Sequence, residues 1–398
     1  MTNTFYTPGL VLTEHELDVP LDHADPASER LTFFAREVAE PDGRDKPFLV
    51  FLQGGPGFEA ARPHGRPRGP GWLGRALKDF RVLLVDQRGT GRSSPVGVRP
   101  PEELVHFRAD AIVRDCELLR EALGVERWSL LGQSFGGLCV HTYLSFAPHN
   151  VREALVTGGI PPLGPRIDDV YRATYATLAA RNEAYYERYP ADRARVLALH
   201  EQDVRLPSGD RLTPRRLRQL GGMLGMSDGA EALHYILEQP AGSPGFRHDA
   251  EGALDFARNP LYAVLHEACW ADGGATRWSA ERLLPEMPPE WFTGEHVYPW
   301  MFEEYGALAP LRAAAETLAA HEWPRLYDEA QLAANTVPVA AAVYAHDMYV
   351  DRALSEETAA RVGGLRVWLT SEYEHNGLRA DGDRVLGHLL DMVRGGAS

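Results

Sequence analysis

The stretch Trp128–Val140, WSLLGQSFGGLCV, decides the fold of this chain. An apolar run ending at Leu131 meets Gly132-Gln133-Ser134-Phe135-Gly136, and an apolar segment able to form a helix follows. A serine with glycines two residues before and after it is typical of the nucleophile elbow, a strained strand-to-helix turn. This pattern predicts an exposed Ser134, with the Phe135 N–H at the helix N-terminus, where it can stabilise an oxyanion. The residues also fit an ordinary Gly-Ser turn, so the surrounding sequence has to decide.

Short apolar runs on both sides of the elbow predict the strands of a sheet. Lys46–Leu52 (KPFLVFL) and Arg81–Val85 (RVLLV) are nearly continuously apolar, as strands buried on both faces are. The first ends at Gln53-Gly54-Gly55-Pro56-Gly57, a loop that can bring backbone N–H groups close to a ligand above the sheet. The remaining predicted elements before residue 160 are an antiparallel pair at Val11–Val19 and Leu31–Val38, a helix at Glu102–Leu123 ending at Gly124, and a strand at Glu153–Val156.

The character of the chain changes between Pro161 and about Asn335. Helical patterns rich in Ala, Arg, Glu and Tyr replace the strands there, for example at Tyr171–Tyr189 and Leu308–Ala320. Strands return at Val337–Tyr344 and Leu365–Leu369, and Arg379–Val393 is predicted to be a closing helix. The order predicts the α/β class, with a helical insertion after the sixth strand. We therefore expect a catalytic domain of residues 1–160 and 336–398, and a helical cap domain of residues 161–335.

A serine nucleophile needs a general base, and the base needs an acid to orient it. On this architecture the acid and the histidine follow the serine, each after a late strand. Asp347 comes directly after Val339–Ala345, and His375 follows Val367–Thr370. Ser134, Asp347 and His375 are thus predicted at one edge of the sheet, where open α/β sheets bind ligands. Asp351 competes for the acid position, although it also fits the N-cap of a following helix.

The amino-acid composition excludes some classes of binding partner. The 398 residues include 41 Lys and Arg against 56 Asp and Glu, a net charge of -15, which argues against a nucleic-acid or anionic-membrane partner. No apolar run approaches membrane-spanning length, and the N-terminus has no pattern of a secretory signal. Three well-separated cysteines are expected to be reduced core residues of a cytoplasmic protein. We expect neither metal nor cofactor, because no His-Glu-x-x-His, P-loop or dinucleotide pattern is present.

Three motifs occur together in this chain: the Gly-Gly-Pro-Gly loop within 53–57, an Asp-Gln-Arg-Gly-x-Gly-x-Ser segment at 86–93, and the elbow at 132–137. With these motifs the chain resembles the prolyl aminopeptidases, or proline iminopeptidases, of the α/β-hydrolases. The segments 53–58 and 373–378 are similar to the longer-chain branch, which has an enlarged cap. The resemblance implies an α/β-hydrolase fold and release of N-terminal proline from peptides.

The resemblance also implies how the substrate amine is held. Two cap glutamates hold it in family members, and the matching positions are Glu267 in LHEACW and Glu295 in TGEHVY. Glu303 and Glu304 are rival candidates, and both matching glutamates could instead be solvated helix residues. Tyr171 is similar to a family residue that lines the proline pocket.

The predicted function is that of a serine exopeptidase acting on peptides with a free N-terminal proline. Ser134 attacks, His375 transfers the proton and Asp347 orients the imidazole, while the N–H groups of Phe135, Gly54 and Gly55 stabilise the oxyanion. Two alternatives stay open: an esterase or broader aminopeptidase of the same fold, and a binding protein without activity. The sequence does not determine the oligomeric state.

Overall fold

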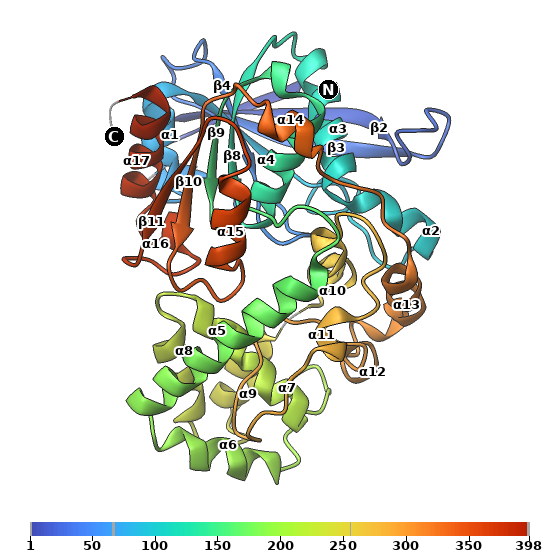
Figure 1. Cartoon of the computed structure of the whole chain (residues 1–398), viewed down its shortest axis with the longest axis vertical. Helices are drawn as coiled ribbons and strands as arrows, with labels where there is room; N and C mark the ends of the chain where they lie inside the picture. Colours follow the sequence, from blue (N-terminus) through green and yellow to red (C-terminus); the bar gives the residue numbers. More distant parts are fainter. Residues whose placement is uncertain (1, 66–67, 255, 396–398) are drawn as a thin grey trace.

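The computed structural model describes residues 2–65, 68–254 and 256–395, which form a sheet-containing unit and a helical unit beside it (Figure 1). Residue 1 and residues 396–398, at the ends of the predicted catalytic domain, lie outside the described residues. The helical unit is an insertion between two neighbouring strands of the sheet, β9 and β10.

The main sheet has nine strands in the order β1-β2-β3-β7-β4-β8-β9-β10-β11. Antiparallel pairing joins β1 to β2, β2 to β3 and β3 to β7, and every pair from β7 onward is parallel. The strands are β1 (Thr2–Thr7), β2 (Leu10–Pro20), β3 (Arg30–Ala39), β4 (Phe48–Leu52), β7 (Arg81–Asp86), β8 (Trp128–Gln133), β9 (Val151–Thr157), β10 (Val339–Tyr344) and β11 (Leu365–Thr370). The prediction of a mostly parallel α/β sheet is confirmed. A separate two-stranded ribbon is formed by β5 (His64–Gly65) and β6 (Arg68–Gly69).

Helices cover both faces of this sheet because alternate strand residues point to opposite sides. On one face, Phe51 and Leu84 belong to the same buried cluster as Leu77 and Leu389 of helices α1 (Leu73–Asp79) and α17 (Gly382–Arg394). On the other face, Val50 packs with residues of α3 (Ala109–Ala122) and α4 (Phe135–Phe146). Burial on both faces explains why the central strands read as continuous apolar runs. Two further helices belong to this unit, α15 (Arg352–Ala359) and α16 (Gly377–Ala380).

The structure differs from the sequence prediction in three elements. Strand β1 was not predicted, and it makes β9 the seventh strand of the main sheet. The predicted helix Glu102–Leu123 is broken into α2 (Pro101–Leu104), the 3-10 turn η1 (Val105–Phe107) and α3. Arg108 is extended at the break, and its buried guanidinium donates to the Ala271 and Pro324 carbonyls at 2.6 and 3.1 Å. These contacts hold the break and tie it to the insertion. The predicted closing helix is likewise split, into α16 and α17, at Asp381, whose backbone is not helical.

The insertion is built from helices and short turns. They are α5 (Ile167–Arg188), α6 (Asp192–His200), α7 (Pro214–Arg218), η3 (Gln219–Gly225), α8 (Gly229–Leu237), α9 (Pro244–Ala253), α10 (Pro260–Leu265), η4 (Ala268–Trp270), α11 (Ser279–Arg282), α12 (Met301–Glu304), η5 (Ala309–Leu311), α13 (Arg312–Ala320) and α14 (Glu329–Ala333). A further 3-10 turn, η2 (Pro148–Asn150), precedes β9. Within the described parts of the chain, no helix is long and apolar enough to cross a membrane.

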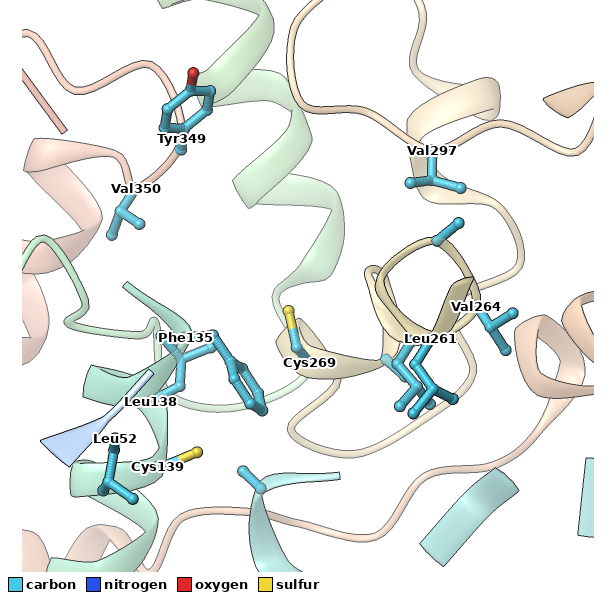
Figure 2. Close-up of a cluster of buried hydrophobic side chains, with 14 of the residues drawn as sticks. Leu52, Phe135, Leu138, Cys139, Leu261, Val264, Cys269, Val297, Tyr349 and Val350 are labelled. Atoms are coloured by element: carbon cyan, nitrogen blue, oxygen red, sulfur yellow. The ribbon is translucent and has the colours of Figure 1, made fainter. Parts of the chain in front are cut away.

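One cluster of buried apolar side chains runs from the sheet into the insertion. Figure 2 shows part of it, with Leu52 from β4, Phe135 and Leu138 from α4, and Leu261, Val264 and Cys269 from the insertion. The insertion is therefore packed onto the carboxyl-end edge of the sheet, where the parallel strands deliver the predicted site residues.

Candidate active site

Ser134 occupies the turn between β8 and α4 in a backbone conformation that side chains rarely adopt, with φ 55° and ψ −124°. The two flanking glycines make this turn possible. A Cβ at Gly132 would lie 2.3 Å from the Gly136 carbonyl oxygen, and a Cβ at Gly136 would lie 1.9 Å from that of Leu52. Any larger residue would push α4 away from the sheet. The strained turn directs the Ser134 side chain out of the strand, at the edge of the sheet where the site is predicted.

The structure brings the three predicted triad residues into one hydrogen-bonded row. His375 Nε2 lies 2.9 Å from Ser134 Oγ, and its Nδ1 lies 2.7 Å from Asp347 Oδ2. Ser134 is half-buried, whereas Asp347 and His375 are buried. Residues 134, 347 and 375 follow β8, β10 and β11, so the sheet itself sets their spacing.

The two candidate acids have different surroundings. The second oxygen of Asp347, Oδ1, accepts hydrogen bonds from the N–H groups of Tyr349 at 2.9 Å and Val350 at 3.0 Å. These bonds leave Oδ2 to face His375. Asp351 instead accepts from the Leu354 N–H at 2.9 Å and forms the N-cap of α15. The Asp351 carboxylate is therefore engaged in capping this helix, as its position in the sequence predicts.

Opposing effects act on the imidazole. Burial tends to lower the pKa of His375, whereas the charge and hydrogen bond of Asp347 raise it, with a smaller contribution from Glu295. The net pKa lies above the usual histidine value. An imidazole with this environment can take a proton from Ser134 and is stabilised once it is charged.

The predicted oxyanion loop lies against the serine. A Cβ at Gly54 would be 3.1 Å from Ser134 Cβ, so the Gly54 backbone is directly beside the nucleophile position. Gly55 adopts φ 128°, which favours glycine, and Phe135 begins α4. The loop and the helix N-terminus thus flank Ser134, and backbone N–H groups in such places can stabilise a developing negative charge.

Glu295 is a carboxylate in the wall of a cavity of about 230 Å³, which is lined mostly by the insertion and otherwise by Phe58 and Tyr349 of the sheet unit. Tyr262 in α10 donates a hydrogen bond to Glu295 Oε1 at 2.5 Å, and no Lys or Arg of the described chain forms an ion pair with it. Burial raises the pKa of Glu295, while the Tyr262 hydrogen bond and the charge of His375 oppose that rise. A positively charged group entering this cavity would relieve the cost of the buried charge.

Tyr171 and Glu295 line a second, smaller cavity together with His296 and Tyr349. The Tyr171 ring is buried in α5, with its centroid 5.7 Å from that of His296. Burial lowers the pKa of His296 to about 3, so this wall is aromatic and uncharged at neutral pH. It offers apolar surface next to a carboxylate.

The structure does not place Glu267 in the wall of either cavity. Its Oε1 accepts from the Ala280 N–H at 2.9 Å, at the start of α11, while Oε2 is buried without a hydrogen-bond partner among the described residues. Burial raises the pKa of Glu267. The rivals Glu303 and Glu304 form ion pairs with Arg312 and Arg215 and line neither cavity.

Four residues of the site were not found from the sequence. Tyr262 holds Glu295, and the Tyr349 ring packs edge-on against His375 with centroids 4.8 Å apart. A Cβ at Gly158 would lie 3.2 Å from His375 Nδ1, so this glycine leaves room for the imidazole. Arg181 of α5 donates to the His346 carbonyl at 2.7 Å and to the Glu374 carboxylate, next to both triad partners of Ser134. No local motif marks these residues, since each acts on a segment distant in sequence.

Comparisons with known proteins agree with this geometry. The sequence profile of the alpha/beta hydrolase fold matches residues 47–378. A proline iminopeptidase of Aeromonas sobria is 46% identical, with 97% of each chain covered. One from Aspergillus aculeatus is 35% identical over 97% of this chain and 94% of its own. The crystal structure of a Mycobacterium smegmatis proline iminopeptidase, 14% identical, covers 96% of this chain and 98% of its own with a TM-score of 0.51, which supports the fold. The predicted resemblance is confirmed, and the chain belongs to the proline iminopeptidase family of α/β-hydrolases.

Proposed function

We propose that this protein is a serine exopeptidase that releases proline from the free N-terminus of peptides. The observation that carries the proposal is the row formed by Ser134, His375 and Asp347, together with the half-buried carboxylate of Glu295. The names of the full-length relatives support the same substrate class.

In the proposed reaction, Ser134 Oγ attacks the carbonyl carbon of the N-terminal proline while its proton passes to His375 Nε2. The N–H groups of Phe135, Gly54 and Gly55 stabilise the negative oxygen of the tetrahedral intermediate. His375 then gives that proton to the nitrogen of the leaving peptide, the C–N bond breaks, and an acyl-enzyme remains. Water, deprotonated by His375, hydrolyses the ester and releases proline.

Selectivity for the N-terminal residue would come from the charged amine. We assign the amine-binding role to Glu295, because it lines both of these cavities and its charge is near enough to His375 to raise the pKa of the imidazole. Tyr171 supplies apolar wall for the ring. Glu267, whose Oε2 has no hydrogen-bond partner among the residues that the structure describes, is a second candidate for the amine. We also propose a cytoplasmic location, supported by three free cysteines that are all buried.

The experiment compares Pro-p-nitroanilide, acetyl-Pro-p-nitroanilide, Ala- and Leu-p-nitroanilide and p-nitrophenyl acetate. We expect Pro-p-nitroanilide to be cleaved best and its acetylated form to be refused. Ser134→Ala should lower kcat by several orders of magnitude while leaving the thermal unfolding curve unchanged. Equal cleavage of the acetylated substrate would favour a general esterase or amidase. If Ser134→Ala kept more than about a tenth of the activity, the serine mechanism would be wrong, since loss of a general base alone costs roughly 10²-fold.

A further inference from the structure

A third cavity, of about 380 Å³, has His375 in its wall but not Glu295. Its apolar wall combines residues of the sheet unit with one residue of the insertion: Phe51, Pro70, Trp72, Leu378 and Met226. Neither Glu295 nor Tyr171 lines it, and it shares only Met226 with the 230 Å³ cavity. We propose that this cavity binds the side chain of the second residue of the peptide, the one that follows the N-terminal proline, and selects for large apolar residues there.

The proposal rests on the proposed function and on the proton transfer from His375 to the leaving nitrogen of the peptide. His375 has to protonate the leaving nitrogen, so that nitrogen lies at the imidazole when the C–N bond breaks. The amine of the N-terminal residue is assigned to the Glu295 side. We therefore expect the next residue to occupy the third cavity, which is lined by His375 and not by Glu295.

The cavity is adjacent to the nucleophile as well. Its lining includes Gln53 and Gln133. A Cβ at Gly54 would meet Gln133 Oε1 at 2.5 Å and Ser134 Cβ at 3.1 Å, which places this amide beside Ser134. Neither glutamine side chain has a hydrogen-bond partner among the described residues. Both amides are thus available to the peptide backbone of the leaving group.

The chemistry of the lining favours an apolar occupant. The Phe51 and Trp72 rings pack with centroids 4.5 Å apart and form one wall. Arg379 contributes a positive charge, but it is paired with Asp228 at 3.1 Å. Asn376 Oδ1 accepts from the N–H and hydroxyl of Ser227 in the insertion. Arg379 and Asn376 therefore already have polar partners, and burying a large apolar side chain against the aromatic wall is favourable.

The test measures kcat/KM of the wild type for prolinamide, Pro-Gly-amide, Pro-Leu-amide and Pro-Phe-amide. Prolinamide releases only ammonia and places nothing in the cavity. We expect Pro-Phe-amide and Pro-Leu-amide to exceed Pro-Gly-amide by about tenfold or more, the gain typical of burying such a side chain. Equal values for Pro-Gly-amide and Pro-Phe-amide would overturn the proposal. Failure to cleave any of the four would overturn the proposed function itself.

A larger residue in place of Gly71 would fill the cavity without changing any residue of the triad. It lines the cavity, and a Cβ there would meet only the Arg379 carbonyl oxygen, at 4.0 Å. Gly71→Phe should lower kcat/KM for Pro-Phe-amide at least tenfold and leave prolinamide within about twofold. Gly97→Phe is the matched control, because Gly97 also has open space and lines none of these cavities. An equal loss on prolinamide and Pro-Phe-amide in Gly71→Phe would contradict a role for this cavity in binding the leaving group.

Discussion

At the scale of single residues, the site depends on carboxylates whose oxygens have different partners. Asp347 gives one oxygen to backbone N–H groups and the other to His375. Glu295 has a tyrosine hydroxyl on one oxygen and open cavity around it. Because these partners orient each carboxylate, similar acidic residues are expected to respond very differently to the same substitution.

Asp347→Asn is expected to reduce kcat by orders of magnitude, because the amide would favour the wrong tautomer of His375. Asp351→Asn should change kcat little, since Asn caps a helix about as well as Asp. Steady-state kinetics on Pro-p-nitroanilide, with thermal unfolding of both variants, provide the measurement. The reverse ranking would move the acid to Asp351.

Glu295→Gln is expected to lower kcat/KM for Pro-p-nitroanilide at least tenfold, because a buried charge-assisted contact contributes about 1.5–3 kcal/mol. Hydrolysis of p-nitrophenyl acetate, which has no amine, should change much less. The substitution also removes a charge that raises the pKa of His375. Since His375 acts as a base only when neutral, the acid limb of the pH profile should move to lower pH.

Glu267→Gln is the matched control for this substitution. Its side chain would still accept the hydrogen bond from the Ala280 N–H, and the charges that raise the pKa of His375 are those of Asp347 and Glu295. We expect an unchanged acid limb and a smaller loss of kcat/KM. A loss equal to that of Glu295→Gln, on the proline substrate alone, would show that both glutamates hold the amine.

At the scale of elements, the insertion contributes to the geometry of the triad as well as to the pocket. Arg181 in α5 donates to the His346 carbonyl and to Glu374, one residue before Asp347 and one before His375. Its guanidinium is well suited to this because it presents several donors in a fixed plane. One insertion helix thus ties together the two loops that follow β10 and β11.

Arg181→Gln is expected to lower kcat about three- to tenfold, as loss of hydrogen bonds involving a charged group would allow both loops to shift. Arg181→Lys should restore only part of the activity, since Lys lacks the planar fork. Arg172→Gln serves as the control in the same helix, because Arg172 is paired with Asp169 at the surface. If Arg181→Gln lowered only the melting temperature, with wild-type kcat and pH profile, its role would be merely structural.

At the scale of the whole molecule, one apolar cluster joins the sheet unit and the insertion. Cys116 in α3 and Cys269 in η4 belong to this cluster, on opposite sides of the junction. Burial raises the pKa of both thiols well above the usual cysteine value and that of Cys139 as well. The thiols can therefore report whether the two units unfold together.

We expect the native protein to show no rapid reaction with Ellman's reagent, because a buried, protonated thiol is a poor nucleophile. In increasing urea, the three cysteines should become reactive over the same range in which activity is lost. Mass mapping of partially labelled protein identifies which thiol reacts. Labelling of Cys269 at lower urea than Cys116 would mean that the insertion unfolds on its own.

The sequence by itself determined the α/β class and the family, and it predicted that Ser134, Asp347 and His375 follow strands that end at one edge of the sheet. These features can be recognised in the sequence because they depend on local patterns: apolar strands, glycines around a turn, and polar residues directly after strands. The parallel sheet then brings the strand ends together whatever the rest of the chain does.

Only the tertiary structure decided which residues surround the triad. Tyr262 and Glu295 are 33 positions apart, and Arg181 and Glu374 are 193 positions apart, so no periodicity connects them. The same is true of three further features, which local sequence does not predict: the direction of Glu267 toward α11, the break at Arg108 and the cavity beside His375. Each arises from tertiary packing, either within the insertion or between the insertion and the sheet unit, and such packing overrides local propensity.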